Sequence, residues 1–275
     1  MAATSTETGS DNPNRELWYT IFGVGHPDLH KFQRFNMRLP SPPRCKLCYA
    51  PYRGLGRLVM KLQGRAPSSK NPRYCSRCDQ FMRAYPGGAE VEMTIAFLDV
   101  RGSSGLGEKM TPWEFSRGMQ RFYAETFGVL YDTDGFIVDV RGDGLLAVYP
   151  PGFSGRDHAR KALRAVEQLL GKSIVAADGT ALRFGTGVHT GVAYVGTMTG
   201  AEAGVEDVTV LGDAVNVAAR LCAAAAPGEA LVSDAACAAA GVTPGGLEHR
   251  DLELKGKSER VGAFVLWAGA SLRLH

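Results

Sequence analysis

Two aspartates stand at the ends of apolar runs, where they could hold metal ions. Asp99 is the last residue but one of the apolar run MTIAFLDV (93–100). Asp143 lies in a Gly-Asp-Gly turn between two further apolar runs. Carboxylate oxygens suit Mg²⁺ or Mn²⁺, which also bind the phosphates of a substrate. Each aspartate alone is more simply explained as a turn former, because Asp is common in turns. The pair therefore predicts a metal site only if the fold brings both carboxylates together.

Four cysteines form two Cys-x-x-Cys pairs that could close a second, different metal site. Cys45 and Cys48 are separated by 26 residues from Cys75 and Cys78. In a reducing compartment such pairs indicate a metal before a disulfide. Four thiolates at this spacing predict structural Zn²⁺, and an iron–sulfur cluster would use the same ligands. The spacing does not separate the two.

The elements that must position these residues fall into two regions of opposite charge. Residues 15–88 carry 14 Lys and Arg against 3 Asp and Glu, a formal charge of +11. The whole chain carries +3 and the first 14 residues −2, so the segment from Ala89 onward carries −6. A boundary near Pro86-Gly87-Gly88 fits this change and the turn chemistry of these residues. We predict a disordered tail at 1–14, a basic four-cysteine module at 15–88, a larger domain at 89–268 and a C-terminal tail at 269–275.

Composition is typical of a globular protein, with 45% hydrophobic and 21% charged residues. No run is apolar enough for a membrane helix, and the polar, acidic start lacks the features of a signal peptide. We therefore expect a cytoplasmic protein without a membrane partner. The basic residues of the module could bind nucleic acid or an acidic partner, but we favour a solvated surface or contact with the acidic domain.

Beyond residue 89, strand and helix signals alternate in the order strand, helix, hairpin, helix, strand. This order predicts an α+β fold with a ferredoxin-like βαββαβ core and extra elements, preceded by a small zinc-ribbon-like module with short helices. In such a core the first strand lies beside the hairpin, so Asp99 and Asp143 would converge. The predicted elements are strands at 93–100, 136–141 and 145–150, helices around 115–123 and 159–170, a strand pair at 183–191 and 193–198, and a helix beginning at Asp213.

Five motifs together resemble the class III adenylate/guanylate cyclase catalytic domain in order and spacing. The resemblance implies a homodimer with active sites at the subunit interface. It also implies conversion of a nucleoside triphosphate to a 3′,5′-cyclic nucleotide and pyrophosphate, in cyclic-nucleotide signalling. The motifs are FLDVRGSS (97–104), GDGLLAVYP (142–150), GVHTGVAYVGTMTG (187–200), TVLGDAVNVAARL (209–221) and LKGKSERVGAFVL (254–266).

The resemblance also implies roles for individual residues. Asp99 and Asp143 would hold two Mg²⁺ or Mn²⁺ ions. Asn216 would orient the ribose, and Arg220 would neutralise charge that grows on the phosphate in the transition state. These two share one helix face with Asp213 by spacing alone. Lys257, rather than Lys255, would contact the triphosphate from a mobile loop.

The predicted base pocket departs from the adenylate cyclase pattern. Asp139 stands where those enzymes usually carry Lys and guanylate cyclases carry Glu, and Thr209 stands at the second base position. An ionised Asp accepts hydrogen bonds from guanine but not from adenine N1, so the pair favours GTP. Arg141 shares the strand face of Asp139 and could pair with it or contact the base. ATP and a pyrimidine substrate stay open, as does a catalytically degenerate nucleotide-binding protein whose basic module binds nucleic acid or a protein.

Overall fold

The computed structural model of the chain describes residues 12–39, 43–176, 178–199, 206–254, 260–270 and 272. Lys255 and Lys257, the two predicted loop lysines, lie outside these residues, as does most of the predicted tail. Among the helices described, none combines the length and apolar character needed to cross a membrane.

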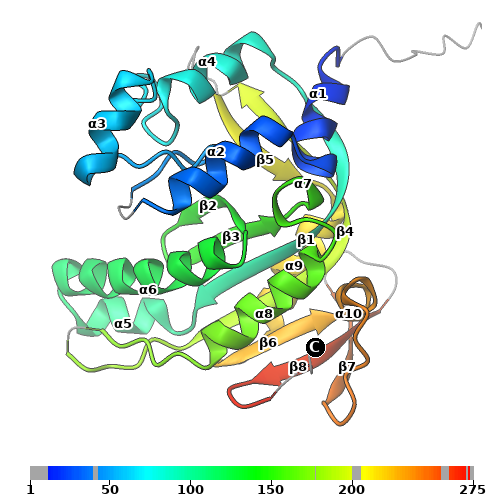
Figure 1. Cartoon of the computed structure of the whole chain (residues 1–275). Coiled ribbons are helices and arrows are strands. Elements are labelled where there is room, and N and C mark those ends of the chain that lie inside the picture. Colours follow the sequence, from blue (N-terminus) through cyan, green and yellow to red (C-terminus); the bar gives the residue numbers. More distant parts are fainter. Residues whose placement is uncertain are drawn as a thin grey trace, which may run out of the picture. The chain divides into compact units, whose positions relative to one another are not determined.

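The elements follow one another along the chain as Figure 1 shows. They are α1 (Arg15–Tyr19), the π-helical turn η1 (Thr20–Val24), α2 (Pro27–Met37), α3 (Gly54–Leu62), α4 (Ser76–Ala84), β1 (Gly88–Val100), α5 (Ser103–Lys109), α6 (Pro112–Asp132), β2 (Phe136–Arg141), β3 (Gly144–Tyr149), α7 (Pro151–Ser154), α8 (His158–Leu170), β4 (Phe184–Thr199), β5 (Glu206–Leu211), α9 (Asp213–Ala224), β6 (Glu229–Ser233), α10 (Asp234–Ala240), β7 (His249–Leu252) and β8 (Val261–Trp267).

The sheet of the described residues confirms the predicted α+β class. Its strands are ordered β2-β3-β1-β4-β6-β8-β7, and β5 pairs with β4 off this path. The first four positions carry the predicted βαββαβ core, with the hairpin β2–β3 beside β1. Strand β1 runs antiparallel to β3, with Asp99 opposite Gly144. The hairpin turn and the end of β1 therefore lie at one edge.

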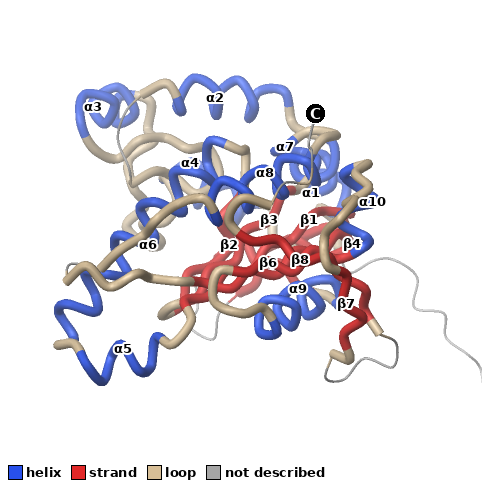
Figure 2. Tube along the Cα trace, turned by 90° about the horizontal axis from the view of Figure 1, so that it is seen from below, coloured by secondary structure: helices blue, strands red, loops and turns tan. Residues whose placement is uncertain are grey.

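Helices cover the two faces of this sheet unequally. Helices α6, α8 and α10 pack on one face, where they share a core with β1 and β3, and α9 packs on the other face against β6 and β8 (Figure 2). The pattern follows from the sequence, because α8 presents its Ala and Leu stripe to the sheet. Helix α9 buries Val217 and Leu221 in a separate cluster.

One predicted strand pair is wrong. Residues 184–199 form the single strand β4, whereas the sequence pattern predicts two paired strands at 183–191 and 193–198. Gly191 is not a turn residue here: a Cβ at this position would lie 3.0 Å from the Cβ of Ala214. The glycine therefore permits α9 to approach the strand, and the hairpin partner of β4 is β5.

The chain divides into two compact units. One holds the residues up to Val91 together with Tyr194–Thr209, and the other holds Glu92–Ala193 together with Val210 onward. The far end of β4 and the first part of β5 thus belong with the four-cysteine module. The domain boundary near Gly88, which rests on the change in charge, stays a prediction. It does not account for Tyr194–Thr209, which joins the N-terminal unit from later in the chain.

Candidate active site

Asp99 and Asp143 lie close together at one edge of the sheet. Asp99 is the last residue but one of β1, and Asp143 occupies the β2–β3 turn, where its carbonyl accepts a hydrogen bond of 3.1 Å from the Val100 N–H. The Ser103 hydroxyl, at the start of α5, donates to the Asp143 carboxylate. The two carboxylates that are 44 residues apart in sequence therefore converge, as the fold predicts.

The electrostatics of this pair suit a cation. Partial burial and the negative charge of Asp143 raise the pKa of Asp99, against the opposing effect of Arg101. The same two carboxylates contribute, after burial, to a raised pKa of Tyr123, whose hydroxyl donates to the Gly142 carbonyl. A divalent cation shared by hard oxygen ligands would relieve this repulsion. The donor set thus fits Mg²⁺ or Mn²⁺.

Arg101 is a site residue that sequence reasoning missed. Its Nη1 lies 2.6 Å from Oδ2 of Asp99, and its Nε donates to the Ala225 carbonyl at 3.1 Å. Nη2 donates to the Cys222 carbonyl, so the guanidinium caps the C-terminal end of α9, where cations are favourable. A Cβ at Gly185 would lie 2.3 Å from this guanidinium. A glycine inside a strand was the available signal.

The polar face of α9 is as predicted. Asn216 is exposed and Arg220 half-buried, while the opposite face is buried. Neither side chain has a hydrogen bond or ion pair within the described part of the chain. Gly187 of β4 makes the close packing of α9 possible, since a Cβ there would lie 2.1 Å from the Cys222 nitrogen. These groups are therefore available to a ligand or to a second chain.

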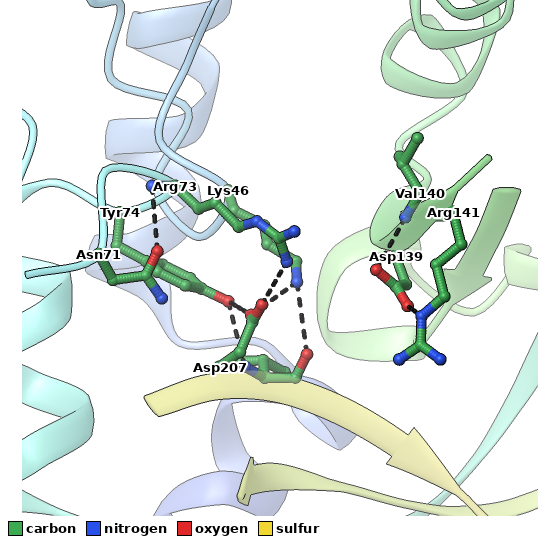
Figure 3. A network of polar contacts seen from close by, with 9 residues as sticks. Lys46, Asn71, Arg73, Tyr74, Asp139, Val140, Arg141 and Asp207 are labelled. Atoms are coloured by element: carbon green, nitrogen blue, oxygen red, sulfur yellow. Dashed lines mark hydrogen bonds and ion pairs between the residues drawn. The ribbon is translucent and has the colours of Figure 1, made fainter. Parts of the chain in front are cut away.

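Asp139 and Arg141 form an ion pair at the end of β2. Arg141 Nε lies 2.5 Å from Asp139 Oδ2, and the Val140 N–H donates to the other oxygen at 2.9 Å (Figure 3). The guanidinium is almost fully exposed, with 88% of its side-chain surface accessible. The predicted pairing is thus present. Thr209, the other base-pocket candidate, is a half-buried residue of β5 in the other unit.

The four paired cysteines are buried and meet in one cluster. Their sulfur atoms all lie within 4.8 Å of one another, and those of Cys48 and Cys75 are 3.7 Å apart. Tetrahedral coordination with Zn–S bonds of about 2.3 Å places sulfur atoms about 3.8 Å apart. The Cys75 N–H donates to the Cys45 sulfur at 3.2 Å. The geometry fits a tetrahedral thiolate centre.

Within the described part of the chain, Arg65 Nε and the Tyr52 hydroxyl are buried beside this cluster and bond to no nitrogen or oxygen atom, and both side chains adjoin its sulfur atoms. Burial acts to lower the pKa of Arg65, but Cys48, Cys75 and Cys78, when they carry charge as thiolates, outweigh burial and raise it. A divalent ion with four thiolates carries a net charge of −2, which a buried guanidinium would partly balance. The surroundings therefore fit a cluster in its ionised, metal-bound form.

Helix α2 supports the first knuckle, the loop from Cys45 to Cys48, through two buried side-chain amides. The Gln33 side chain donates to the Leu47 carbonyl at 2.9 Å, and the Asn36 side chain donates to the Cys48 carbonyl at 2.8 Å. Both accepting carbonyls belong to the loop that carries Cys45 and Cys48. The predicted short helices before the cysteines are thus part of the module that shapes its metal site.

A comparison with family models matches residues 88–266 to the adenylate and guanylate cyclase catalytic domain. The chain belongs to this family. Among curated relatives, the cyclase domain is 34% identical over 136 residues to an adenylate cyclase of Anabaena cylindrica, covering 47% of this chain and 26% of the relative. It is 32% identical over 136 residues to adenylate cyclase 1 of Rhizobium meliloti, covering 47% and 20%. The chain thus spans about a quarter or less of these relatives.

Solved cyclase structures share the fold of the domain. The guanylyl cyclase Cya2 superimposes with a TM-score of 0.58 and 25% identity, over 66% of this chain and 95% of that one. The adenylyl cyclase CyaB of P. aeruginosa gives a TM-score of 0.55 with 22% identity, over 65% and 95%. Because an adenylyl and a guanylyl cyclase match about equally well, the fold of the cyclase domain does not select a base.

Proposed function

We propose that the chain is a nucleotidyl cyclase that converts ATP or GTP to a 3′,5′-cyclic nucleotide and pyrophosphate. The observation that carries this proposal is the convergence of Asp99 and Asp143 at one edge of a cyclase domain. Structural relatives of both base specificities support the reaction type. A role in cyclic-nucleotide signalling follows from the product.

In this proposal Asp99 and Asp143 hold two Mg²⁺ or Mn²⁺ ions. Such ions, when bound, lower the pKa of the ribose 3′-hydroxyl and neutralise charge on the triphosphate. Ser103 orients Asp143 through its hydroxyl, and Arg101 orients Asp99 through the short ion pair. Arg101 also balances the charge of Asp99 until a cation binds.

Asn216 and Arg220 orient the ribose and neutralise the growing phosphate charge in this proposal. We assign them to the site of a second copy of the chain, so that the enzyme is a homodimer with interfacial active sites. Their free side chains on one face of α9 support this assignment. One similar structure is a non-canonical dimeric guanylyl cyclase domain of the RhoGC fusion protein, with a TM-score of 0.55 and 17% identity, so domains of this fold do associate in pairs.

For the base we propose Asp139 and Thr209 as contacts, with Arg141 as the competing candidate. Lys257 is proposed to contact the triphosphate. The ion pair of Asp139 with Arg141 means that a guanine must displace or share the guanidinium to reach the carboxylate. The proposal therefore favours GTP without excluding ATP.

The metal site is tested by incubating the wild type, Asp99→Ala and Asp143→Ala with ATP or GTP and Mn²⁺, and identifying products by mass. We expect a cyclic product from the wild type and its loss in both variants, with fold and oligomeric state unchanged, because neither carboxylate supports the core. Near-normal turnover by either variant would refute the two-metal assignment. A wild type that binds the triphosphates without turnover would favour a degenerate nucleotide-binding protein.

For the module we propose one structural Zn²⁺ bound by Cys45, Cys48, Cys75 and Cys78, in a cytoplasmic protein where these thiols stay reduced. We expect about one zinc per chain and a colourless protein. Cys45→Ser or Cys78→Ser should unfold the module, because so small a unit depends on its metal. Elemental analysis measures the zinc content per chain, and amide hydrogen exchange measures the unfolding of the module in the two variants. A brown protein with stoichiometric iron would contradict zinc and assign an iron–sulfur cluster to this site.

A further inference from the structure

Asp207, on β5, receives three donors from the four-cysteine module. Lys46 Nζ lies 2.8 Å from Oδ1, Arg73 Nη1 lies 2.6 Å from Oδ2, and the Tyr74 hydroxyl also donates to Oδ1 (Figure 3). Burial would raise the pKa of Asp207, but Lys46 and the other donors outweigh it and lower the pKa. Both carboxylate oxygens are thus bound, and the group is ionised at neutral pH.

Two of these side chains, Lys46 and Tyr74, also bond to the β5 backbone. The Val208 N–H donates to the Tyr74 hydroxyl at 3.1 Å, and Lys46 Nζ donates to the Val208 carbonyl at 3.4 Å. Within the described sheet, β5 pairs with β4. The N–H and C=O of one strand residue point to the same side, so the module occupies the strand edge that faces away from β4. It replaces a neighbouring strand there.

These donors are built into the metal knuckles. Lys46 lies inside the first Cys-x-x-Cys loop, and Tyr74 directly precedes Cys75. The Lys46 N–H donates to the Arg73 carbonyl at 2.9 Å, which joins the two knuckles. Tyr74 is fully buried, so its ring cannot turn independently of the backbone beside Cys75. A shift of that backbone would therefore carry the Tyr74 hydroxyl away from β5. The position of the donors is therefore fixed by the cluster that the metal closes.

Asp207 and Thr209 lie two residues apart on β5 and share a strand face, about 7 Å apart. Val208, which lies between them, and Val210, which follows Thr209, are buried on the other face. Four residues after Thr209 the chain enters α9 at Asp213. Fixing the strand at Asp207 and Val208 thus fixes the backbone that presents Thr209.

We propose that the metal-bound module is a clamp on β5, and that Asp207 is a positioning residue through which metal occupancy governs nucleotide binding at Thr209. This inference rests on the proposed cyclase function. Release of the clamp weakens base binding but leaves Asp99 and Asp143 in place. KM for the triphosphate should therefore rise more than kcat falls.

The test compares the wild type with Asp207→Asn and Lys46→Met, each with its bound metal measured. Lys172→Met is the matched control, because Lys172 forms an ion pair of 2.7 Å with Glu125 away from β5. Amide hydrogen exchange is followed in residues 206–211, with β6 as internal reference. ATP and GTP turnover with Mn²⁺ gives KM and kcat.

We expect both clamp variants to retain metal, to exchange β5 amides faster, and to raise KM roughly threefold to tenfold, the loss of one hydrogen bond. Removing the metal with a chelator should accelerate the same amides, and the control should change neither quantity. Unchanged β5 exchange in both variants, or after metal loss, overturns the clamp. Faster exchange with unchanged KM overturns its link to the nucleotide. A wild type without turnover refutes the cyclase proposal, and exchange alone then decides the clamp.

Helix α3 carries an independent feature, an apolar stripe that faces outward. Leu55, Leu58, Val59 and Leu62 recur at helical spacing and are exposed, Leu55 by 86% and Leu62 by 90%. The opposite side of the helix is buried through Gly56 and Met60. Exposed Leu side chains of this extent in one stripe are unusual and indicate a docking surface.

Positive charge accompanies this stripe. Arg57 and Lys61 are exposed and lie on one flank of it by helical geometry, in a module of formal charge +11. Against the expectation of no membrane partner, we infer that α3 docks on an anionic lipid surface, because an apolar stripe with basic residues beside it is the pattern that binds such surfaces.

Vesicle sedimentation tests this surface with phosphatidylcholine alone and with phosphatidylglycerol added. We expect binding only to the anionic vesicles, weakened by salt, and reduced at least about tenfold by Leu55→Ser with Leu62→Ser. Trp113→Ser, which removes another exposed apolar side chain, is the control and should bind normally. Absence of binding, or binding that the double variant retains, overturns the inference. A dimer that the double variant dissociates would instead assign the stripe to a second copy.

Discussion

At the scale of single residues, the proposed site is balanced by charges that sequence reasoning treated separately. Asp99 pairs with Arg101 and Asp139 pairs with Arg141. In each case a carboxylate assigned to a ligand is already neutralised by a cation two residues along the chain. A metal or a base must therefore compete with an existing ion pair, which makes both sites sensitive to the arginines.

The first prediction concerns the base contact of Asp139. GTP should be turned over at least as well as ATP, because an ionised carboxylate opposes the adenine N1 acceptor. An unpaired acceptor in a closed pocket costs about 1–3 kcal/mol, or roughly tenfold to a hundredfold in selectivity. Asp139→Lys should shift the ratio of kcat/KM values toward ATP.

Arg141→Ala separates the two candidates for base contact. If Asp139 contacts the base, removing its partner should leave the preference for GTP or increase it. An ATP-selective wild type whose ratio is unaltered by Asp139→Lys but altered by Arg141→Ala would transfer the role to Arg141.

At the scale of elements, much of the cyclase domain followed from apolar periodicity. The strand that carries Asp99, the hairpin around Asp143 and the helix from Asp213 all form as predicted, because burial pattern and turn residues agree there. The predicted strand pair at 183–191 and 193–198 is wrong, and Gly191 at the junction serves close packing against α9, although glycine also serves for turns. The sequence cannot distinguish these uses without knowing that α9 crosses β4.

The long-range contacts could not be predicted from local signals. Arg101 caps a helix more than a hundred residues later, and Asp207 meets donors from a segment over a hundred residues earlier. Both depend on tertiary placement, for which a single sequence has no periodic pattern. The cysteine cluster could be predicted, because its spacing is itself the signature of the site.

A second prediction belongs to the junction of β1, β4 and α8. His158, at the start of α8, is buried, and its Nδ1 lies 3.0 Å from the Thr94 hydroxyl, which in turn lies 2.7 Å from the Thr190 hydroxyl. Burial lowers the pKa of His158, so the unfolded chain binds a proton more readily than the folded one. The contribution of neutral His158 to the free energy of unfolding is therefore complete above the pKa of about 6.5 in the unfolded chain. It is lost as pH falls through the lower pKa of the folded protein.

Urea unfolding of the wild type and His158→Gln across this pH range tests the prediction. The other histidines titrate in both proteins and cancel in the difference. We expect the stability advantage of the wild type to shrink as pH falls below about 6.5. Two pH profiles that stay parallel would show that His158 does not titrate differently in the folded state.

At the scale of the whole molecule, the chain joins a domain of the cyclase family to a four-cysteine module. The cyclase family model covers residues 88–266, and the four-cysteine module lies before it. Contact geometry nevertheless groups the module with Tyr194–Thr209 of the cyclase domain. The module therefore shares a compact unit with the part of β5 that carries Thr209.

We propose that each active site takes its metal-binding aspartates from one chain and Asn216 and Arg220 from another. Mixing inactive Asp99→Ala with inactive Asn216→Ala, under conditions where subunits exchange, tests it most directly. Each mixed dimer of a two-fold enzyme then holds one intact site and one doubly altered site. We predict that an equal mixture regains about a quarter of wild-type turnover, since about half of its dimers are mixed. Persistent inactivity in dimers proven to be mixed would contradict the shared site.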